Sequence, residues 1–188
     1  MKISIITPCL NSISFIKKTV ESVIFHKPYL DLEYIVVDGN STDGTLEYLN
    51  NIPEIDILIS EKDSGLSEAL NKGMQLATGE IIGWLNAGDF FLEKSLNIID
   101  EIFQKFIFVD WLTARYHLTA NEEGVIFKLS DSKCFASDFF HIGRYSRINE
   151  CSFGNGIQQE STFWRRNLWI RSGSYINEKN KACDYDLW

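Results

Sequence analysis

Four short apolar runs, each followed at once by small and polar residues, dominate the first half of the chain. The runs cover residues 3–7, 34–37, 55–59 and 81–85. Between consecutive runs lies enough chain for a helix, and residues 14–27 and 65–77 carry apolar side chains at the three- and four-residue spacing of one helix face. The pattern predicts strands alternating with helices, hence an α/β fold in which a Rossmann-like, mostly parallel central sheet is flanked by helices.

After residue 90 the alternation is lost. We predict, in order, a helix over 92–105, an apolar run over 106–112, an antiparallel hairpin over 112–118 and 125–129, a loop over 131–155, a strand over 157–164 and a helix over 165–171. A second short helix is predicted to start at Thr42 and Asp43, whose side-chain oxygens suit a helix N-terminus. The length of 188 residues fits a single domain, whose residues 1–90 form a nucleotide-binding half.

Composition narrows the classes of partner and compartment. The hydrophobic content of 45% is that of a folded globular protein, and the net charge of −8 argues against binding nucleic acid by bulk electrostatics. Four scattered cysteines without metal-ligand spacing indicate reduced, mostly buried thiols. A strand follows the initial Met directly, and no apolar run approaches the roughly 18 residues of a membrane span. We expect a cytoplasmic protein, and because 182–188 begin a helical pattern without a stop, a chain truncated at its C-terminus.

Polar side chains stand where the predicted strands end. In open parallel sheets ligands bind outside the carboxyl ends of the strands, so Asn11, Asp38, Asp63 and Asp89 are expected at one edge. Asp38 is suited to accept hydrogen bonds from a ribose or a base edge, with Gly39 allowing close approach. The alternative is a turn that caps the next helix.

The segment 86–89 ends a very apolar strand with an acid. The hard oxygens of Asp89 suit Mg²⁺ or Mn²⁺, which take one or two carboxylates together with phosphate oxygens and waters. The alternative is a solvated acid at a strand end. No glycine-rich dinucleotide fingerprint or P-loop follows any predicted strand.

Two late segments also carry candidate chemistry. Asp184 is a candidate general base, or a helix-start acid, and Asp186 points to another side of the same predicted helix. Gln159 and Glu160 form either a buried polar pair or a substrate-binding pair.

In their order and spacing, these segments resemble the family 2 inverting glycosyltransferases with the GT-A fold, of the bacterial cell-surface polysaccharide type. The resemblance rests on residues 5–11, 35–45, 60–65, 69–73, 77–82, 85–89, 160–166 and 184–188. It implies that residues 91–188 form an acceptor-side half of the single domain 1–188.

The resemblance also implies roles for individual residues. It assigns donor binding to Thr7, Pro8, Asn11, Asp38, Asp63, Asn71 and Asn86. Asp89 matches the last acid of the family's metal-binding D-x-D region, so Mn²⁺ or Mg²⁺ is the expected cofactor, and Asp184 matches the catalytic base. The acceptor side would include Gln159 and Glu160, where many members have His-Gln. Asn86 and Gly88 stand where acids are common.

The implied activity is transfer of one sugar, with inversion, from a nucleotide-diphosphate sugar such as a UDP-sugar to a glycan or lipid-linked acceptor. Such an acceptor leaves a peripheral encounter with the inner face of the membrane open. One alternative is a sugar-nucleotide pyrophosphorylase, for which we would expect a Gly-rich loop with Arg soon after the first strand. Residues 8–12 do not have this composition. The other is a non-catalytic sugar-nucleotide-binding module.

Overall fold

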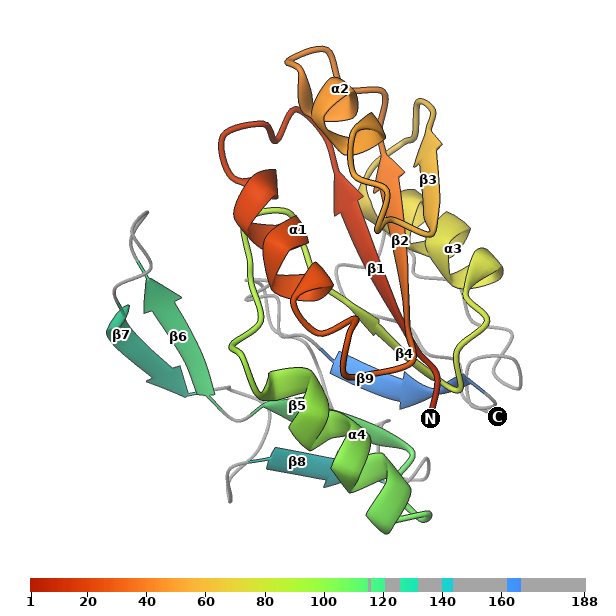
Figure 1. Ribbon diagram of the computed structural model, residues 1–188. Coiled ribbons are helices and arrows are strands. Elements are labelled where there is room, and N and C mark those ends of the chain that lie inside the picture. The colour runs from red at the N-terminus through yellow and green to blue at the C-terminus, as the bar shows by residue number, and fades with distance from the viewer. Residues whose placement is uncertain (115, 121–125, 132–139, 144–161, 167–188) are drawn as a thin grey trace.

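The computed structural model describes residues 1–114, 116–120, 126–131, 140–143 and 162–166. Within this part of the chain, a seven-stranded sheet has the order β3-β2-β1-β4-β9-β5-β8 (Figure 1). Its strands are β1 (Ile3–Cys9), β2 (Leu32–Asp38), β3 (Ile57–Ser60), β4 (Ile81–Trp84), β5 (Trp111–Ala114), β8 (Phe140–Gly143) and β9 (Thr162–Arg165). The four strands from β3 to β4 are parallel to one another, as the alternating pattern predicted.

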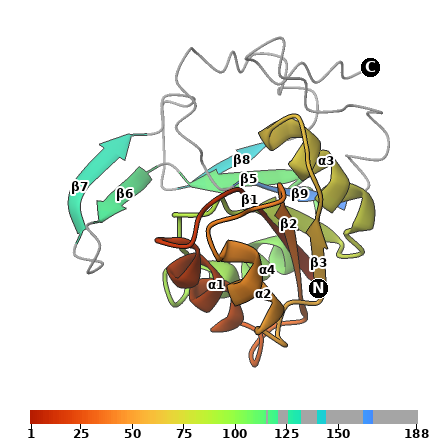
Figure 2. The ribbon, with the colours of Figure 1, turned by 90° about the horizontal axis from the view of Figure 1, so that it is seen from above.

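Helices cover both faces of the parallel strands, as Figure 2 shows from above. On one side lie α1 (Ile16–Ile24), α2 (Thr45–Asn50) and α4 (Ser95–Lys105), and on the other lies α3 (Leu66–Leu76). Because side chains alternate along a strand, each face of the sheet supplies its own core. One core joins Ile3, Ile5 and Tyr34 to the first group of helices, and the other joins Ile6, Ile35 and Val37 to α3. None of the described helices combines the length and apolarity needed to span a membrane.

The second half of the sheet differs from the sequence prediction. The predicted strand 112–118 is split: β5 joins the central sheet, whereas β6 (Tyr116–Ala120) pairs with β7 (Ile126–Asp131) in a separate two-stranded ribbon. The predicted loop 131–155 contains β8, which is stabilised by antiparallel pairing with β5. Arg165, predicted to open a helix, belongs to β9, and residues 167–171 lie outside the described part.

Strand β9 lies between β4 and β5 and is antiparallel to both. Its last residue, Arg165, is held there by carbonyl groups of the α4–β5 segment: the Nε group donates to the Val109 oxygen (2.7 Å) and the Nη2 group to the Phe103 oxygen (2.7 Å). A strand near residue 163 therefore completes a sheet whose first strand begins at residue 3.

Helix α2 begins at Thr45, three residues after the predicted start. Gly44, with φ of 96°, directly precedes the helix, a backbone conformation that favours glycine. Asp43 still serves the helix end, because its Oδ1 atom accepts hydrogen bonds from the Thr45 N–H (3.0 Å) and hydroxyl (2.6 Å).

A buried carboxylate ties three segments together at the edge of the sheet opposite the polar strand ends. Glu33 is 7% exposed and accepts hydrogen bonds from Lys2 Nζ (2.9 Å), Ser4 Oγ (2.5 Å) and the backbone N–H and hydroxyl of Thr78 (2.7 and 2.5 Å). Burial alone raises the pKa of Glu33, but the hydrogen bonds from Ser4, Thr78 and Lys2 outweigh it and lower the pKa to about 2. Through Thr78, this cluster fixes the segment that precedes β4 to the beginnings of β1 and β2.

We expect the Glu33 cluster to make stability depend on pH in acid. Since the folded-state pKa of Glu33 lies below its ordinary value of 4.5, its contribution is fully present above pH 4.5 and is lost as the pH falls from 4.5 towards about 2. Glu33→Gln should lower the unfolding free energy at pH 7 by about 1–3 kcal/mol and flatten the pH dependence in that window. Urea unfolding at a series of pH values measures both, with the exposed Glu54→Gln as the control. An identical pH dependence in Glu33→Gln and the unchanged chain would contradict this account.

Candidate functional site

The expected convergence of polar residues at one edge of the sheet is present. Strands β1, β2 and β3 end level with one another, because Cys9 is paired with Asp38 and Asp38 with Ser60. Strand β4 runs parallel to β1 on its other side. The chain passes from β1 to β2 and β3 in one direction and returns to β4 in the other, so the strand order reverses between β1 and β4. Such a switch point is where open α/β sheets bind ligands.

The Asp38 carboxylate is fully buried among donors from neighbouring segments. Its Oδ2 atom accepts hydrogen bonds from the Ser41 N–H (3.0 Å) and the Ser60 hydroxyl (2.6 Å), and its Oδ1 atom from the Ser41 hydroxyl and the Cys9 thiol (3.8 Å). Burial, followed by the charge of Asp38, raises the pKa of the Cys9 thiol, and this buried cysteine is not in a disulfide. Asp38 therefore holds the ends of β1, β2 and β3 together, and its contact with a donor stays a prediction.

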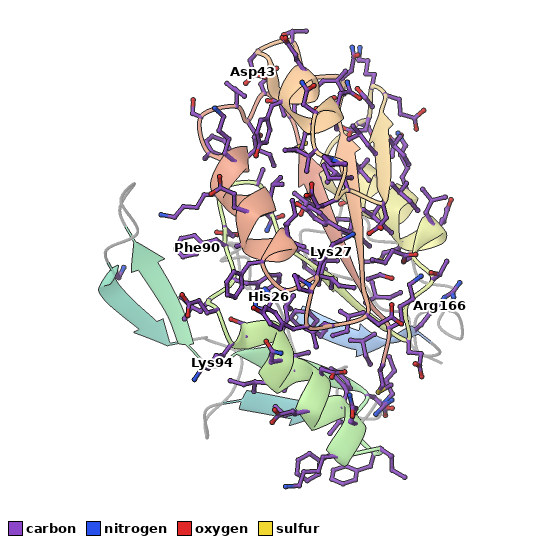
Figure 3. The ribbon with its side chains drawn as sticks, in the orientation of Figure 1. His26, Lys27, Asp43, Phe90, Lys94 and Arg166 are labelled. Carbon is purple, nitrogen blue, oxygen red and sulfur yellow. The ribbon has the colours of Figure 1, made fainter. Side chains whose placement is uncertain are left out.

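Asn11 joins the loop after β1 to the loop after β2. It has a left-handed φ of 48°, its N–H donates to Ser41 Oγ (2.8 Å), and its side-chain oxygen accepts from the Thr42 N–H (2.9 Å). Asp43, labelled beside α2 in Figure 3, accepts from the Ile13 N–H (3.1 Å). The hydrogen bond from Thr45 is the first cause that lowers the pKa of Asp43. The two loops form one hydrogen-bonded rim.

The other predicted donor residues differ in how they are placed. Thr7 is fully buried, with its hydroxyl accepting a hydrogen bond from Tyr34 (3.2 Å), and Pro8 is buried as well. Asp63 is half-buried after β3 and accepts from the Gly65 N–H (3.0 Å), while Asn71 is half-buried on α3. The structure thus brings Asp63 to the strand ends and places Thr7 inside the core, and their contacts with a donor stay predictions.

Gly39 lies where two loops approach each other. A Cβ atom on this residue would stand 3.1 Å from the Asp63 carboxylate and 3.3 Å from a methyl group of Leu10. A side chain here would press on both neighbours. The close approach expected of Gly39 is therefore made by the protein's own Asp63.

Residues 86–89 form a tight turn directly after β4. The Asp89 N–H donates to the Asn86 carbonyl (3.0 Å), and Gly88, the third residue of the turn, has a φ of 102°. A type II turn requires a positive φ at this position, which favours glycine. The conformation of the turn therefore explains the glycine at position 88 of this chain. The Asp89 side chain is exposed, and the Asn86 Oδ1 atom is buried without a hydrogen-bond partner in the described structure.

The model of the family described as "Glycosyl transferase family 2" matches residues 4–126. The chain belongs to this family. The match supports the glycosyltransferase interpretation over the pyrophosphorylase.

Over the aligned residues, the chain is identical to two relatives at about a third of the positions. It is 36% identical over 188 residues to a PGL/p-HBAD biosynthesis glycosyltransferase of Mycobacterium bovis, covering 98% of this chain and 67% of that protein. It is 35% identical over 107 residues to the putative teichuronic acid biosynthesis glycosyltransferase TuaG of Bacillus subtilis, covering 53% of this chain and 42% of TuaG. The chain therefore spans less than half of TuaG.

Solved structures share the fold. Residues 1–349 of TarS from S. aureus superpose with a TM-score of 0.68 at 18% identity, covering 98% of this chain and 53% of that one. The mannosyltransferase PcManGT from Pyrobaculum calidifontis, solved with GDP-Man and Mn²⁺, superposes with a TM-score of 0.62 at 20% identity. The superposition covers 98% of this chain and 50% of PcManGT. These likenesses confirm the expected GT-A fold.

The residues after β4 offer the kind of oxygen ligands that a divalent cation binds. Asp89 offers an exposed carboxylate, and Asn86 offers a buried amide oxygen that no described group satisfies. Elsewhere in the described residues, no three His, Cys, Asp or Glu side chains gather as a metal-binding group. A cation held at Asp89 would therefore need oxygens from a ligand such as a diphosphate to complete its coordination.

The remaining predicted residues, Gln159, Glu160 and Asp184, lie outside the described part of the chain. Two residues of α1 that the motifs did not indicate, Thr19 and Ser22, hold the turn at residues 86–89 and the segment after it. The sequence did contain one indication: a threonine lies beside the apolar face of an amphipathic helix. A hydroxyl buried there needs a hydrogen-bond partner from a second segment.

Proposed function

We propose that the protein transfers one sugar, with inversion, from a nucleotide-diphosphate sugar to a glycan or lipid-linked acceptor. The observation that carries this is the placement of the exposed Asp89 turn at the switch point between β1 and β4. A TarS structure holds UDP-GlcNAc, which supports a UDP-sugar as donor here. The names of the two relatives refer to biosynthesis of teichuronic acid and of PGL/p-HBAD, which supports an acceptor in cell-surface glycan or glycolipid synthesis.

In this proposal the donor lies across the ends of β1, β2 and β4, with its diphosphate beside Asp89. Mn²⁺ or Mg²⁺ bound by Asp89 would supply positive charge that offsets the charge developing on the departing diphosphate. Asp89 binds the cation and so orients the diphosphate. The rim formed by Asn11 and residues 41–43 lines the part of the site that holds the nucleotide. The rim residues hold their positions through the hydrogen bonds already described, so little ordering is needed when the donor binds.

Asp184 is proposed as the base. It accepts the proton of an acceptor hydroxyl while that oxygen bonds to the anomeric carbon. The bond from this carbon to the diphosphate oxygen breaks on the opposite face, and the nucleoside diphosphate leaves with the electron pair. Such a base contributes about 10²–10⁴-fold to the rate.

Binding and hydrolysis of candidate donors test the proposal. With Mn²⁺, a saturating UDP-sugar should raise the melting temperature by about 5–10 °C, more than the matching GDP-sugar, and the donor should be hydrolysed slowly in a metal-dependent way. Binding without hydrolysis or transfer to any acceptor would instead establish a non-catalytic binding module. No shift with any nucleotide sugar would contradict both.

A further inference from the structure

Helix α1 and the turn that follows it present three polar residues towards the segment after β4. Thr19 and Ser22 are three positions apart and so lie on one side of α1, and His26 follows two residues after the end of the helix at Ile24. Thr19 and His26 are fully buried. In Figure 3, His26 lies at the end of α1 and Phe90 lies beside the helix. The segment that follows β4 therefore runs along this side of α1.

The hydroxyl of Thr19 holds two consecutive residues of the turn. The Gly88 N–H donates to Thr19 Oγ1 (2.9 Å), and Thr19 Oγ1 donates to the Asp89 carbonyl (2.7 Å). The hydroxyl thus acts once as acceptor and once as donor. Both bonds go to backbone groups on either side of the Gly88–Asp89 peptide link, so they fix the direction in which the Asp89 side chain leaves the backbone.

Ser22 extends the same attachment by one helical turn. Its Oγ atom accepts from the Phe91 N–H (3.1 Å) and donates to the Thr19 carbonyl (2.8 Å). His26 Nδ1 lies 2.9 Å from the Ser22 carbonyl. The backbone of residues 88–91 is therefore bound to α1 at three points.

These bonds are not what a threonine within a helix usually makes. Its hydroxyl commonly bonds back to a carbonyl of the preceding helical turn, whereas Thr19 reaches residues 69 and 70 positions further along the chain. A buried hydroxyl is costly unless it is paired, so its place is explained by the turn it holds. On the same turn, the Phe15 ring would lie 3.3 Å from a Cβ atom added to Gly88.

We propose that Thr19, assisted by Ser22, is a positioning residue that fixes Asp89 for binding of the metal and the donor diphosphate. The inference rests on the proposed function, in which Asp89 is the metal ligand. A turn released from α1 would have to be ordered each time the cation binds, which lowers affinity. Loss of groups that orient a metal ligand typically weakens metal affinity by about 10–100-fold.

The test compares Thr19→Val, which keeps the shape but removes the hydroxyl, with Thr19→Ser, which restores it. Ser4→Ala is the matched control, because the buried Ser4 hydroxyl also makes one donor bond, to Glu33, and one acceptor bond, from the Gly79 N–H, at the opposite edge of the sheet. The readouts are hydrogen exchange of the Gly88 amide and Mn²⁺ affinity measured calorimetrically in the presence of UDP. Asp89→Ala is measured beside them.

Thr19→Val should speed exchange at Gly88 and weaken Mn²⁺ binding about tenfold, Thr19→Ser should recover most of this affinity, and Ser4→Ala should leave it unchanged. Unchanged Mn²⁺ affinity in Thr19→Val, where Asp89→Ala has lost it, would overturn the inference and leave the proposed function standing. Equal weakening in Ser4→Ala would also overturn it, since general destabilisation would then be the cause. Normal Mn²⁺ affinity in Asp89→Ala would refute the metal assignment in the proposed function and the inference with it.

Discussion

Asp89→Ala is expected to abolish Mn²⁺-dependent binding of the nucleotide sugar and to lower sugar transfer by about three orders of magnitude or more, since a catalytic metal supplies several kcal/mol of charge stabilisation. The Asp89 side chain is exposed, and the turn is held by the backbone hydrogen bond from Asp89 to Asn86 and by the bonds of Gly88 and Asp89 to Thr19, so Asp89→Ala should leave the fold intact. Calorimetric titration of the UDP-sugar with and without Mn²⁺ measures the binding term, and a melting curve checks the fold.

The control for this variant is Glu93→Ala, which removes another exposed acid four residues further along the same segment. It should keep the affinity for the donor. Equal UDP-sugar affinity in Mn²⁺ for Asp89→Ala and the unchanged chain would remove Asp89 from the metal site.

Asp184→Asn is expected to retain donor binding and to lower transfer by about two to four orders of magnitude. Asparagine keeps the size and much of the hydrogen bonding of the carboxyl group but cannot accept the proton of the acceptor hydroxyl. The acidic limb of the pH–rate profile should disappear with it. Steady-state kinetics across pH, with donor affinity measured separately, give both quantities.

Asp186→Asn serves as the neighbouring control, because in the helix predicted from the sequence two residues of separation place it on another side from Asp184. It should affect transfer much less. If the two variants behave alike, or if Asp184→Asn keeps near-full turnover, the base lies elsewhere and Glu160 is the next residue to test.

The parallel half of the fold was predictable because each of its elements is specified locally. Ile3, Ile5 and Ile6 form a strand buried on both faces, and the apolar stripe of Ile16, Val20 and Val23 requires a helix packed on that strand. The polar strand ends followed from topology alone, since parallel neighbours end at the same edge.

The antiparallel half was not predictable in the same way. Whether residue 113 belongs to a local hairpin or to the central sheet is decided by β8 and β9, which come from segments far along the chain. Strand preferences on such a surface depend on the neighbours that cover it. A sequence pattern that shows only local periodicity cannot supply these neighbours.

Within the candidate site, the sequence indicated which acidic residues lie at the carboxyl ends of the strands. It did not indicate which of them is buried and already hydrogen-bonded within the protein. Asp38 and Asp89 look alike as strand-end acids, yet one is buried under four donors and the other is exposed. The difference comes from two serine hydroxyls: the register of β2 and β3 places Ser60 beside Asp38, and the loop after β2 brings Ser41 back to it. Such contacts depend on three-dimensional placement.

The position of β9 has a consequence for the order in which the chain folds as it is synthesised. Until residues 162–165 leave the ribosome, β4 and β5 have no partner between them, and each exposes a row of unpaired backbone groups of the kind that promotes aggregation. Contacts over such sequence separations form slowly. The first ninety residues can assemble early, but β4 and β5 are joined only when β9 arrives, so the nascent chain has to protect the facing edges of both strands from the synthesis of β5 until that of β9.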